Sequence, residues 1–249
     1  MQVFREAFRS FRLVEHQIPM KIAGMIGGLG PESTIDYYKL IIARCRARRP
    51  DAGYPCFLIN SLDLDKGIRL VDSGRLAELA DYLSDGVERL ARAGADFAFM
   101  AANTPHLVFD EVQRRSSLPL ISIVRATCAR VKALGLKKVG LFGTGFTMRA
   151  SFFPDEFRRA GVGMVTPNES ERAFIHQKYL GELLNGTFLE ETRAEVLRIA
   201  RRLTREEGVE AVVLAGTELP LLLRGSGAEV RFLDTAEIHV EAIVDELLR

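Results

Sequence analysis

From Met20 onward, the sequence alternates short apolar runs with longer segments in which apolar residues recur at helical spacing. The apolar runs end in Gly, Asn or Thr and have the length of strands buried on both faces. This alternation is typical of repeated βαβ units, because parallel neighbouring strands need a crossover connection. Strands are expected within residues 21–27, 54–61, 96–103, 118–123, 137–144, 163–167, 210–216 and 231–235, with helices between them, for example at 34–49 and 75–93. The sequence therefore predicts an α/β protein with doubly wound parallel sheets.

The two halves of the chain resemble each other. The segment AGMIGG at residues 23–28 aligns with VGLFGT at 139–144, and GADFAFMAANT from Gly94 aligns with GVEAVVLAGTE from Gly208. The two alignments occur in the same order and with nearly the same spacing. We therefore expect an internal duplication, in which each half forms a small parallel-sheet unit.

Ligands of such sheets bind outside the carboxyl ends of the strands. Four loops follow predicted strands and carry small or polar residues, at 27–34, 102–104, 143–147 and 216–218. If the two halves face each other, these loops share one cleft, where helix N-termini and backbone amides favour anionic groups.

Composition limits the possible functions. Lys and Arg total 34 and Asp and Glu total 33, so the net charge of +1 gives no general attraction to nucleic acid or anionic membrane. No apolar run reaches the roughly 18 residues that a membrane-spanning helix needs. The three cysteines, at positions 45, 56 and 128, include no CxxC pair, which favours a reducing, cytoplasmic compartment. We expect neither a nucleic-acid nor a membrane partner.

Residues 1–19 differ from the rest of the chain. Phe4, Phe8 and Phe11 form one helical stripe with arginines beside it. This N-terminal leader is interpreted as a docked or incidental helix, with a targeting peptide as the alternative.

The first loop, GGLGPEST, contains Gly28, Ser33 and Thr34. It lacks the GxGxxG spacing of a dinucleotide loop and the GK[ST] ending of a phosphate loop, so nucleotide binding is disfavoured. Two interpretations stay open, a carboxylate-binding loop and a tight strand-to-helix turn without a ligand.

Asn103 and Thr104 follow an apolar strand, and Thr217 and Glu218 follow the equivalent strand of the second half. Such side chains bind carboxylate or ammonium groups, but Asn and Thr also cap helices. The recurrence at an equivalent strand end favours function. His106 is interpreted mainly as a buried, hydrogen-bonded histidine.

Five ordered segments then resemble a known family: GMIGGLGPESTIDYY, AANTPH, GTGFTMRASFF, AGTELPLLL and FLDTAEIH. They are similar to the recurring segments of the cofactor-independent aspartate/glutamate racemases, and the resemblance runs from about Lys21 to the C-terminus. It implies two pseudo-symmetric α/β domains, one of residues 20–124 plus 229–249 and one of residues 125–228. It further implies a dicarboxylic amino acid bound between them, no pyridoxal phosphate, other cofactor or metal, and a homodimer.

Racemisation in that family uses one acid/base group on each side of the α-carbon, usually two cysteines. The resemblance places those cysteines at Ala102 and Gly216 of this chain. Neither side chain exchanges a proton, so the two-thiol route is expected to be absent or very slow. Glu218 and His106 are the main candidates to substitute, with Asp63 and His239 behind them, whereas Cys45, Cys56 and Cys128 are interpreted as packing residues.

Further binding residues are implied by the same resemblance. The hydroxyls of Thr144 and Thr147 resemble anion-binding elements, and Arg48 lies where the family has a basic substrate-binding loop. Lys178 is a second candidate cation. For Arg48 and Lys178 a solvated surface position is the alternative.

The leading hypothesis is therefore a racemase-family protein that binds a small carboxylate or amino acid between two domains and acts at its α-carbon. Two alternatives stay open. One is a non-catalytic carboxylate-binding or regulatory protein, and the other is a lyase, decarboxylase or isomerase that uses a single acid/base group.

Overall fold

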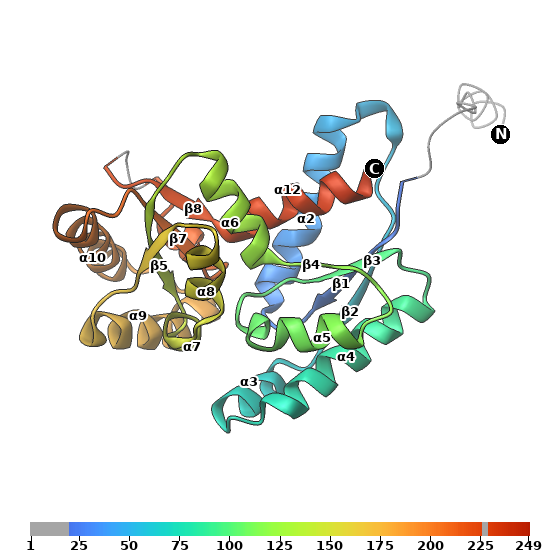
Figure 1. Cartoon of the computed structure of the whole chain (residues 1–249), viewed down its shortest axis with the longest axis horizontal. Coiled ribbons are helices and arrows are strands. Elements are labelled where there is room, and N and C mark those ends of the chain that lie inside the picture. The colour runs from blue at the N-terminus through green and yellow to red at the C-terminus, as the bar shows by residue number, and fades with distance from the viewer. Residues whose placement is uncertain (1–19, 226–228) are drawn as a thin grey trace, which may run out of the picture.

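The computed structural model describes residues 20–225 and 229–249, in two lobes that each hold one parallel sheet (Figure 1). The first sheet has the order β2-β1-β3-β4 and the second has the order β6-β5-β7-β8. The strands are β1 Ala23–Gly27, β2 Phe57–Ser61, β3 Phe97–Met100, β4 Leu120–Ile121, β5 Lys138–Gly143, β6 Gly163–Val165, β7 Ala211–Ala215 and β8 Phe232–Asp234. Each strand falls within a range predicted from the sequence. The predicted fold class is confirmed.

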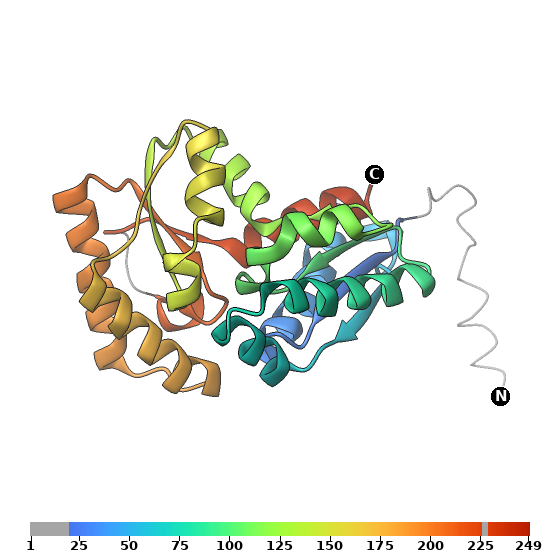
Figure 2. The ribbon, with the colours of Figure 1, turned by 60° about the horizontal axis from the view of Figure 1, so that its bottom comes forward.

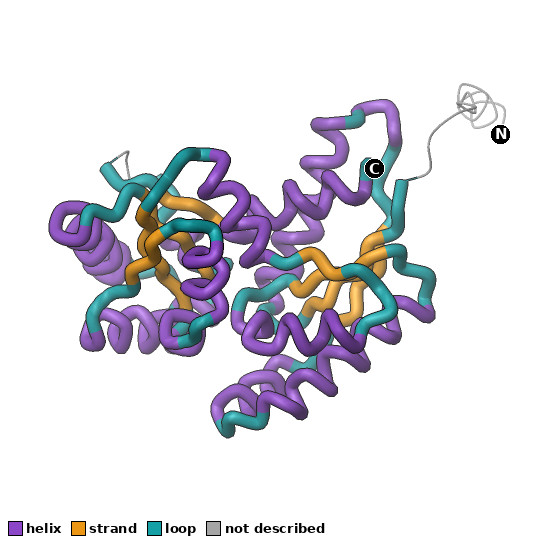
Figure 3. The backbone as a smooth tube through the Cα atoms, viewed as in Figure 1, coloured by secondary structure: helices purple, strands orange, loops and turns teal. Residues whose placement is uncertain are grey.

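The two sheets have the same topology, so β1 corresponds to β5 and β3 to β7. In the first sheet Ala23 of β1 pairs with Phe97 of β3, and in the second Val139 of β5 pairs with Ala211 of β7. The central strands β1, β3 and β7 are buried along their whole length, because helices cover both faces of each sheet (Figure 3).

Helices connect the strands of each sheet. The helices are α2 Pro31–Arg48, α3 Leu64–Asp72, α4 Leu76–Arg92, α5 Phe109–Arg115, α6 Ile123–Ala133, α7 Gly145–Arg149, α8 Phe152–Arg159, α9 Glu169–Gly181, α10 Glu190–Glu207, α11 Leu219–Leu222 and α12 Thr235–Leu247. Short 3-10 helices are η1 Pro50–Ala52, η2 Thr104–Val108 and η3 Leu183–Asn185. The predicted helices at 34–49 and 75–93 correspond to α2 and α4. The N-terminal leader at residues 1–19 lies outside the described residues.

Apolar side chains spaced three or four residues apart attach the helices to the sheets. On α4, Leu79, Leu83, Val87 and Leu90 lie on one buried face against the first sheet. The second sheet is covered on one face by α9 and α10 and on the other by α6 and α8.

The last helix, α12, returns to the first domain. Val240, Ile243 and Leu247 pack with Tyr37 and Ile41 of α2. In Figures 1 and 2 the C-terminus consequently lies beside the first domain, and α6 and α12 lie side by side where the domains meet. The expected domain boundary places residues 229–249 in the first domain, but β8 pairs with β7 and extends the second sheet. The chain thus crosses over between β8 and α12.

Candidate functional site

The carboxyl ends of the central strands of both sheets open into one cavity between the domains. Its volume is about 790 Å³, including the part that is open to solvent. The first domain contributes the loops after β1 and β3 and part of α3, and the second contributes the loops after β5 and β7 and the end of α9. The lining residues are Leu29, Gly30, Ser33, Leu64, Gly67, Ile68, Val71, Leu79, Ala102, Asn103, Thr104, Pro105, Thr144, Phe146, Tyr179, Leu180, Leu184, Ala215, Gly216, Thr217 and Glu218.

Ala102 and Gly216 both line this cavity, each just after the central strand β3 or β7 of its sheet. Their surroundings differ. A Cβ atom at Gly216 would lie 2.5 Å from Cε2 and 2.8 Å from the hydroxyl oxygen of Tyr179. Both distances are below any normal contact with a Cβ atom, so the Tyr179 ring occupies the space that a side chain at position 216 would need.

Tyr179 and Glu218 form a buried pair beside Gly216. The Tyr179 hydroxyl donates a hydrogen bond to Oε2 of Glu218, and the hydroxyl of Thr217 donates to the same oxygen at 2.8 Å. The exposed fractions of Tyr179 and Glu218 are only 5% and 3%. Burial, together with the negative charge of Glu218, raises the pKa of Tyr179 well above its ordinary value, so the phenol is a neutral hydrogen-bond donor.

Nothing in the sequence singles out Tyr179, because a tyrosine one position after the candidate cation Lys178 carries no catalytic pattern of its own. Only the contact between α9 and the loop after β7 reveals it.

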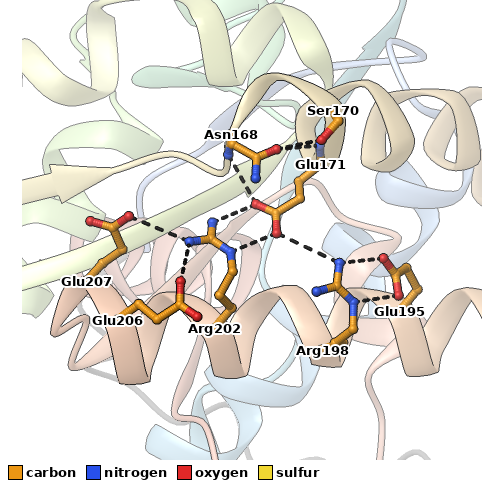
Figure 4. Close-up of polar contacts among 8 residues, drawn as sticks. All are labelled: Asn168, Ser170, Glu171, Glu195, Arg198, Arg202, Glu206 and Glu207. Atoms are coloured by element: carbon orange, nitrogen blue, oxygen red, sulfur yellow. Dashed lines mark hydrogen bonds and ion pairs between the residues drawn. The ribbon is translucent and has the colours of Figure 1, made fainter.

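The position of Tyr179 depends on how α9 is held. Asn168 and Glu171 form a capping box at its N-terminus: the Asn168 side chain accepts from the backbone N–H of Glu171, and the Glu171 carboxylate accepts from that of Asn168. The same carboxylate accepts two hydrogen bonds from Arg202 of α10, at 2.8 and 2.6 Å (Figure 4). Despite the opposing effect of burial, these contacts lower the pKa of Glu171. This buried ion pair joins α9 to α10.

Asn103 and Thr104 lie at the start of η2 on the first-domain side of the cavity. The Asn103 amide donates to the hydroxyl of Thr235 at 3.2 Å, and that hydroxyl donates to the Leu214 carbonyl at 2.8 Å, which ties the loop to the second domain. The Asn103 Oδ1 atom is buried and has no hydrogen-bond partner among the described residues. A buried oxygen of this kind is a hydrogen-bond acceptor that the described residues leave unsatisfied.

Thr104 meets the second domain directly. Its hydroxyl oxygen is 3.4 Å from those of Thr144 and Thr147. Thr144 caps α7 by accepting from the Thr147 N–H at 3.3 Å. Thr144 lines the cavity, whereas Thr147 lies fully buried behind it.

In the first loop, the hydroxyls are largely used within the protein. Ser33 lines the cavity but donates to the Ala101 carbonyl at 2.6 Å. Thr34 accepts from the Gly28 N–H at 2.8 Å and donates to the Gly30 carbonyl at 3.0 Å. Gly28 has a positive φ of 78°, and a Cβ there would lie 2.3 Å from the Leu62 carbonyl oxygen. Gly28 and Thr34 thus build the strand-to-helix turn, and neither is among the residues that line the cavity.

The two candidate cations lie outside the cavity lining. Arg48, in the last turn of α2, forms an ion pair with Asp245 of α12 at 2.5 Å. Lys178 forms an ion pair with Glu182 and lies over the ring of Phe174. Neither is among the residues that line the cavity.

The histidine candidates lie behind the cavity. His106 stacks on Phe109, and its two ring nitrogens lie 3.1 Å from the Ala102 carbonyl and 3.2 Å from the Ile123 N–H. His239 lies 2.9 Å from the Tyr37 hydroxyl. Burial lowers the pKa of His106 to about 3 and that of His239 to about 4, so both are neutral at pH 7. The structure thus accounts for His106 as the buried, hydrogen-bonded histidine that the sequence favoured.

The remaining candidates are structural in their contacts. Asp63 caps α3 by accepting from the Lys66 N–H at 3.1 Å. The three cysteines are free, and none lines the cavity. Burial raises the pKa of Cys45 and Cys128, which disfavours a reactive thiolate at either.

Within residues 20–225 and 229–249, no helix is long and apolar enough to cross a membrane, and no group of three or more His, Cys, Asp or Glu is placed to hold a metal ion.

A profile of the Asp/Glu/hydantoin racemase family matches residues 26–243. The chain belongs to this family. It is 32% identical to a candidate Asp/Glu racemase from Yersinia pestis, whose structure covers 92% of this chain and is itself fully covered, with a TM-score of 0.85. An aspartate racemase homologue from Pyrococcus horikoshii OT3 is 35% identical, with 92% and 99% of the two chains covered and a TM-score of 0.78. The broad specificity amino-acid racemase RacX of Bacillus subtilis is 21% identical over 90% of this chain and 97% of its own length.

Proposed function

We propose that this member of the Asp/Glu/hydantoin racemase family binds a small carboxylate or amino acid in the interdomain cavity and does not racemise it by a two-thiol route. The observation that carries the proposal is the Tyr179 ring, which fills the space beside Gly216 that a second acid/base side chain would need. On the opposite side Ala102 offers only a methyl group. Loss of a positioned acid/base group typically costs about 10²- to 10⁴-fold in rate, and both are missing.

A second candidate function is proton transfer on one side only. It is favoured by the Tyr179–Glu218 pair. Among the described residues that line the cavity, Glu218 is the one carboxylate. A carboxylate and a phenol beside Gly216 supply one acid/base group to one face of a bound ligand. Such a site would exchange an α-proton, or protonate a carbanion, with retention of configuration.

Proton NMR in deuterated water separates these functions. The chain is incubated with D- and L-amino acids and dicarboxylates, and the α-proton signal and the enantiomer ratio are followed. A protein that only binds causes neither deuterium incorporation nor racemisation. Incorporation with retained configuration, abolished in a Glu218→Gln variant, identifies one-sided proton transfer. Rapid racemisation by the unmodified chain would refute the loss of two-sided chemistry.

Restoring the thiols tests the same proposal in the other direction. Because Tyr179 blocks position 216, the variant must combine Ala102→Cys and Gly216→Cys with Tyr179→Ala. We expect this triple variant to gain racemisation, and the double-cysteine variant with Tyr179 intact to gain much less. The matched control replaces both cysteines with serine, which has nearly the same shape but does not ionise in this range. A folded, ligand-binding triple variant without any gain would contradict the proposal.

The proposal includes a cytoplasmic location and a homodimer without a nucleic-acid or membrane partner. The unpaired thiols of all three cysteines and the nearly balanced charge support the location. The homodimer rests on the family resemblance alone. Size-exclusion chromatography with light scattering tests it.

A further inference from the structure

The walls of the interdomain cavity are mostly apolar. Leu64, Ile68 and Val71 of α3 form one wall, and their side chains are only partly buried. Phe146 of α7 and Leu184 of η3 approach from the second domain and are also partly buried. These side chains have apolar surface left to cover, and burying it against an apolar ligand group would be favourable by about 25 cal/mol per Å².

The charges around the cavity disfavour a ligand with a second carboxylate in its side chain, such as aspartate or glutamate. Among the lining residues from 20–225 and 229–249, none is Arg or Lys, and Glu218 alone has a formal charge. Lys178 and Arg48 are held in ion pairs with Glu182 and Asp245. A ligand carboxylate near Glu218 would therefore be buried beside a like charge without a cation, which is costly.

Two acceptors instead fit a positively charged donor. The Glu218 carboxylate already accepts from two neutral hydroxyls, and an ammonium group would add the positive charge that they lack. Asn103 is 5% exposed, lines the cavity, and holds Oδ1 without a hydrogen-bond partner in the described structure. An N–H donor from a ligand would satisfy this atom.

One carboxylate can still be bound by neutral donors. The Thr104 and Thr144 hydroxyls come from the two domains and lie 3.4 Å apart, a distance too long for a strong mutual hydrogen bond. Both residues line the cavity, and the Thr144 hydroxyl also lies 3.2 Å from that of Thr147. A ligand oxygen can accept from the Thr104 and Thr144 hydroxyls in place of these long contacts. The cavity thus offers acceptors for one ammonium group, donors for one carboxylate and apolar walls for the rest.

We propose that the ligand is an amino acid with an apolar side chain, bound through its ammonium group to Glu218 and Asn103, rather than aspartate or glutamate. This inference rests on the proposed function, because it names the ligand class of the same cavity. Phe146, Leu184 and the α3 wall determine the preference, since none of them can pair with a side-chain carboxylate.

Isothermal titration calorimetry tests the inference with four ligands: L-leucine, D-leucine, L-aspartate and D-aspartate. We expect at least one leucine enantiomer to bind at least about tenfold more tightly than either aspartate, because one unpaired buried charge costs that much or more. Tighter binding of aspartate would overturn the inference and leave the proposed function standing. Binding of none of the four would overturn both, so the two failures are distinguishable.

Two further probes distinguish the contribution of the ammonium group to binding from that of the carboxylate. 3-Methylbutylamine lacks the carboxylate and 4-methylpentanoate lacks the ammonium group. We expect the amine to bind more tightly than the acid, and Glu218→Gln to weaken leucine and the amine by about tenfold, the usual value of a charge-assisted hydrogen bond. Equal leucine affinity in a folded Glu218→Gln variant would refute the role of Glu218.

A wall substitution keeps the inference testable if Glu218→Gln fails to fold. Ile68→Arg places a guanidinium in the apolar wall and should shift the leucine-to-aspartate affinity ratio by at least about tenfold toward aspartate. The matched control is Ser73→Arg, which adds the same charge at the exposed end of α3, outside the cavity. The inference fails if both arginine variants change the ratio equally or if neither does.

Discussion

Acidification should destabilise this protein through two buried histidines at the domain junction. His106 and His239 are neutral, fully enclosed and hydrogen-bonded, and their rings lie 6.4 Å apart. Burial lowers the pKa of His106 to about 3, with the neighbouring His239 adding to the effect, and burial lowers that of His239 to about 4. In the unfolded chain both pKa values return to about 6.5.

The direction in which pH changes the free energy of unfolding follows from proton uptake. Between pH 6.5 and the folded-state values, the unfolded chain binds protons that the folded protein does not, so the free energy of unfolding falls as the pH falls. The contribution is complete above pH 6.5 and is lost progressively toward pH 4 and below. From pH 7 to pH 5, each histidine should remove about 1.9 kcal/mol, or about 4 kcal/mol together.

Urea unfolding at pH 7 and pH 5 measures this loss. A His106→Gln variant keeps one donor and one acceptor but does not titrate, so its loss between the two pH values should be smaller than that of the unmodified chain by about 1.9 kcal/mol. Asp234 acts in the opposite direction: burial raises its pKa to about 6, so protonation of the folded state partly offsets the loss. The Asp234 contribution is the same in the unmodified chain and in the His106→Gln variant, so it cancels when their losses are compared.

The control is His176→Gln, because His176 is only partly buried and should change the pH dependence far less. If the His106→Gln variant loses as much stability between pH 7 and pH 5 as the unmodified chain does, the reasoning about a neutral buried imidazole is refuted.

Two further changes test the turn and the ion pair that position the site. Gly28→Ala should lower the free energy of unfolding by about 2 kcal/mol more than Gly53→Ala, because both glycines have positive φ but only Gly28 would bring a Cβ against a backbone carbonyl; equal losses in urea unfolding would argue against that contact. Arg202→Met should cost about 3 kcal/mol because the buried Glu171 carboxylate loses both hydrogen bonds from Arg202 and keeps only Arg198, at 3.9 Å, as a cation. The double variant Arg202→Met/Glu171→Gln should recover part of that loss, and an Arg202→Met variant as stable as the unmodified chain would show that the pair does not hold α9.

Much of the fold could be predicted from local patterns. Each of the eight strands lies within a predicted range, because fully buried parallel strands are short apolar runs whose length and endings are visible in the sequence. The alignment of AGMIGG at residues 23–28 with VGLFGT at residues 139–144 likewise indicated two similar sheets. The crossover between β8 and α12 could not be placed, because the pairing of β8 with β7 depends on distant residues.

The candidate site was predicted in part. The strand-end rule brought Ala102, Asn103, Gly216 and Glu218 to one cavity, and this rule depends only on chain direction in a parallel sheet. The cations were not predictable in this way: whether Arg48 and Lys178 face a ligand or an acid on the surface depends on where Asp245 and Glu182 lie.

The sequence by itself determined the two parallel sheets, their duplication and the absence of a proton-exchanging side chain at positions 102 and 216, because these follow from residue identity and short-range periodicity. Only the tertiary structure decided that the Tyr179 ring fills the space beside Gly216, that Glu218 is its hydrogen-bond partner and that apolar walls surround them. The physical reason is that burial and contact depend on side chains that are distant in sequence and meet only when the two domains pack.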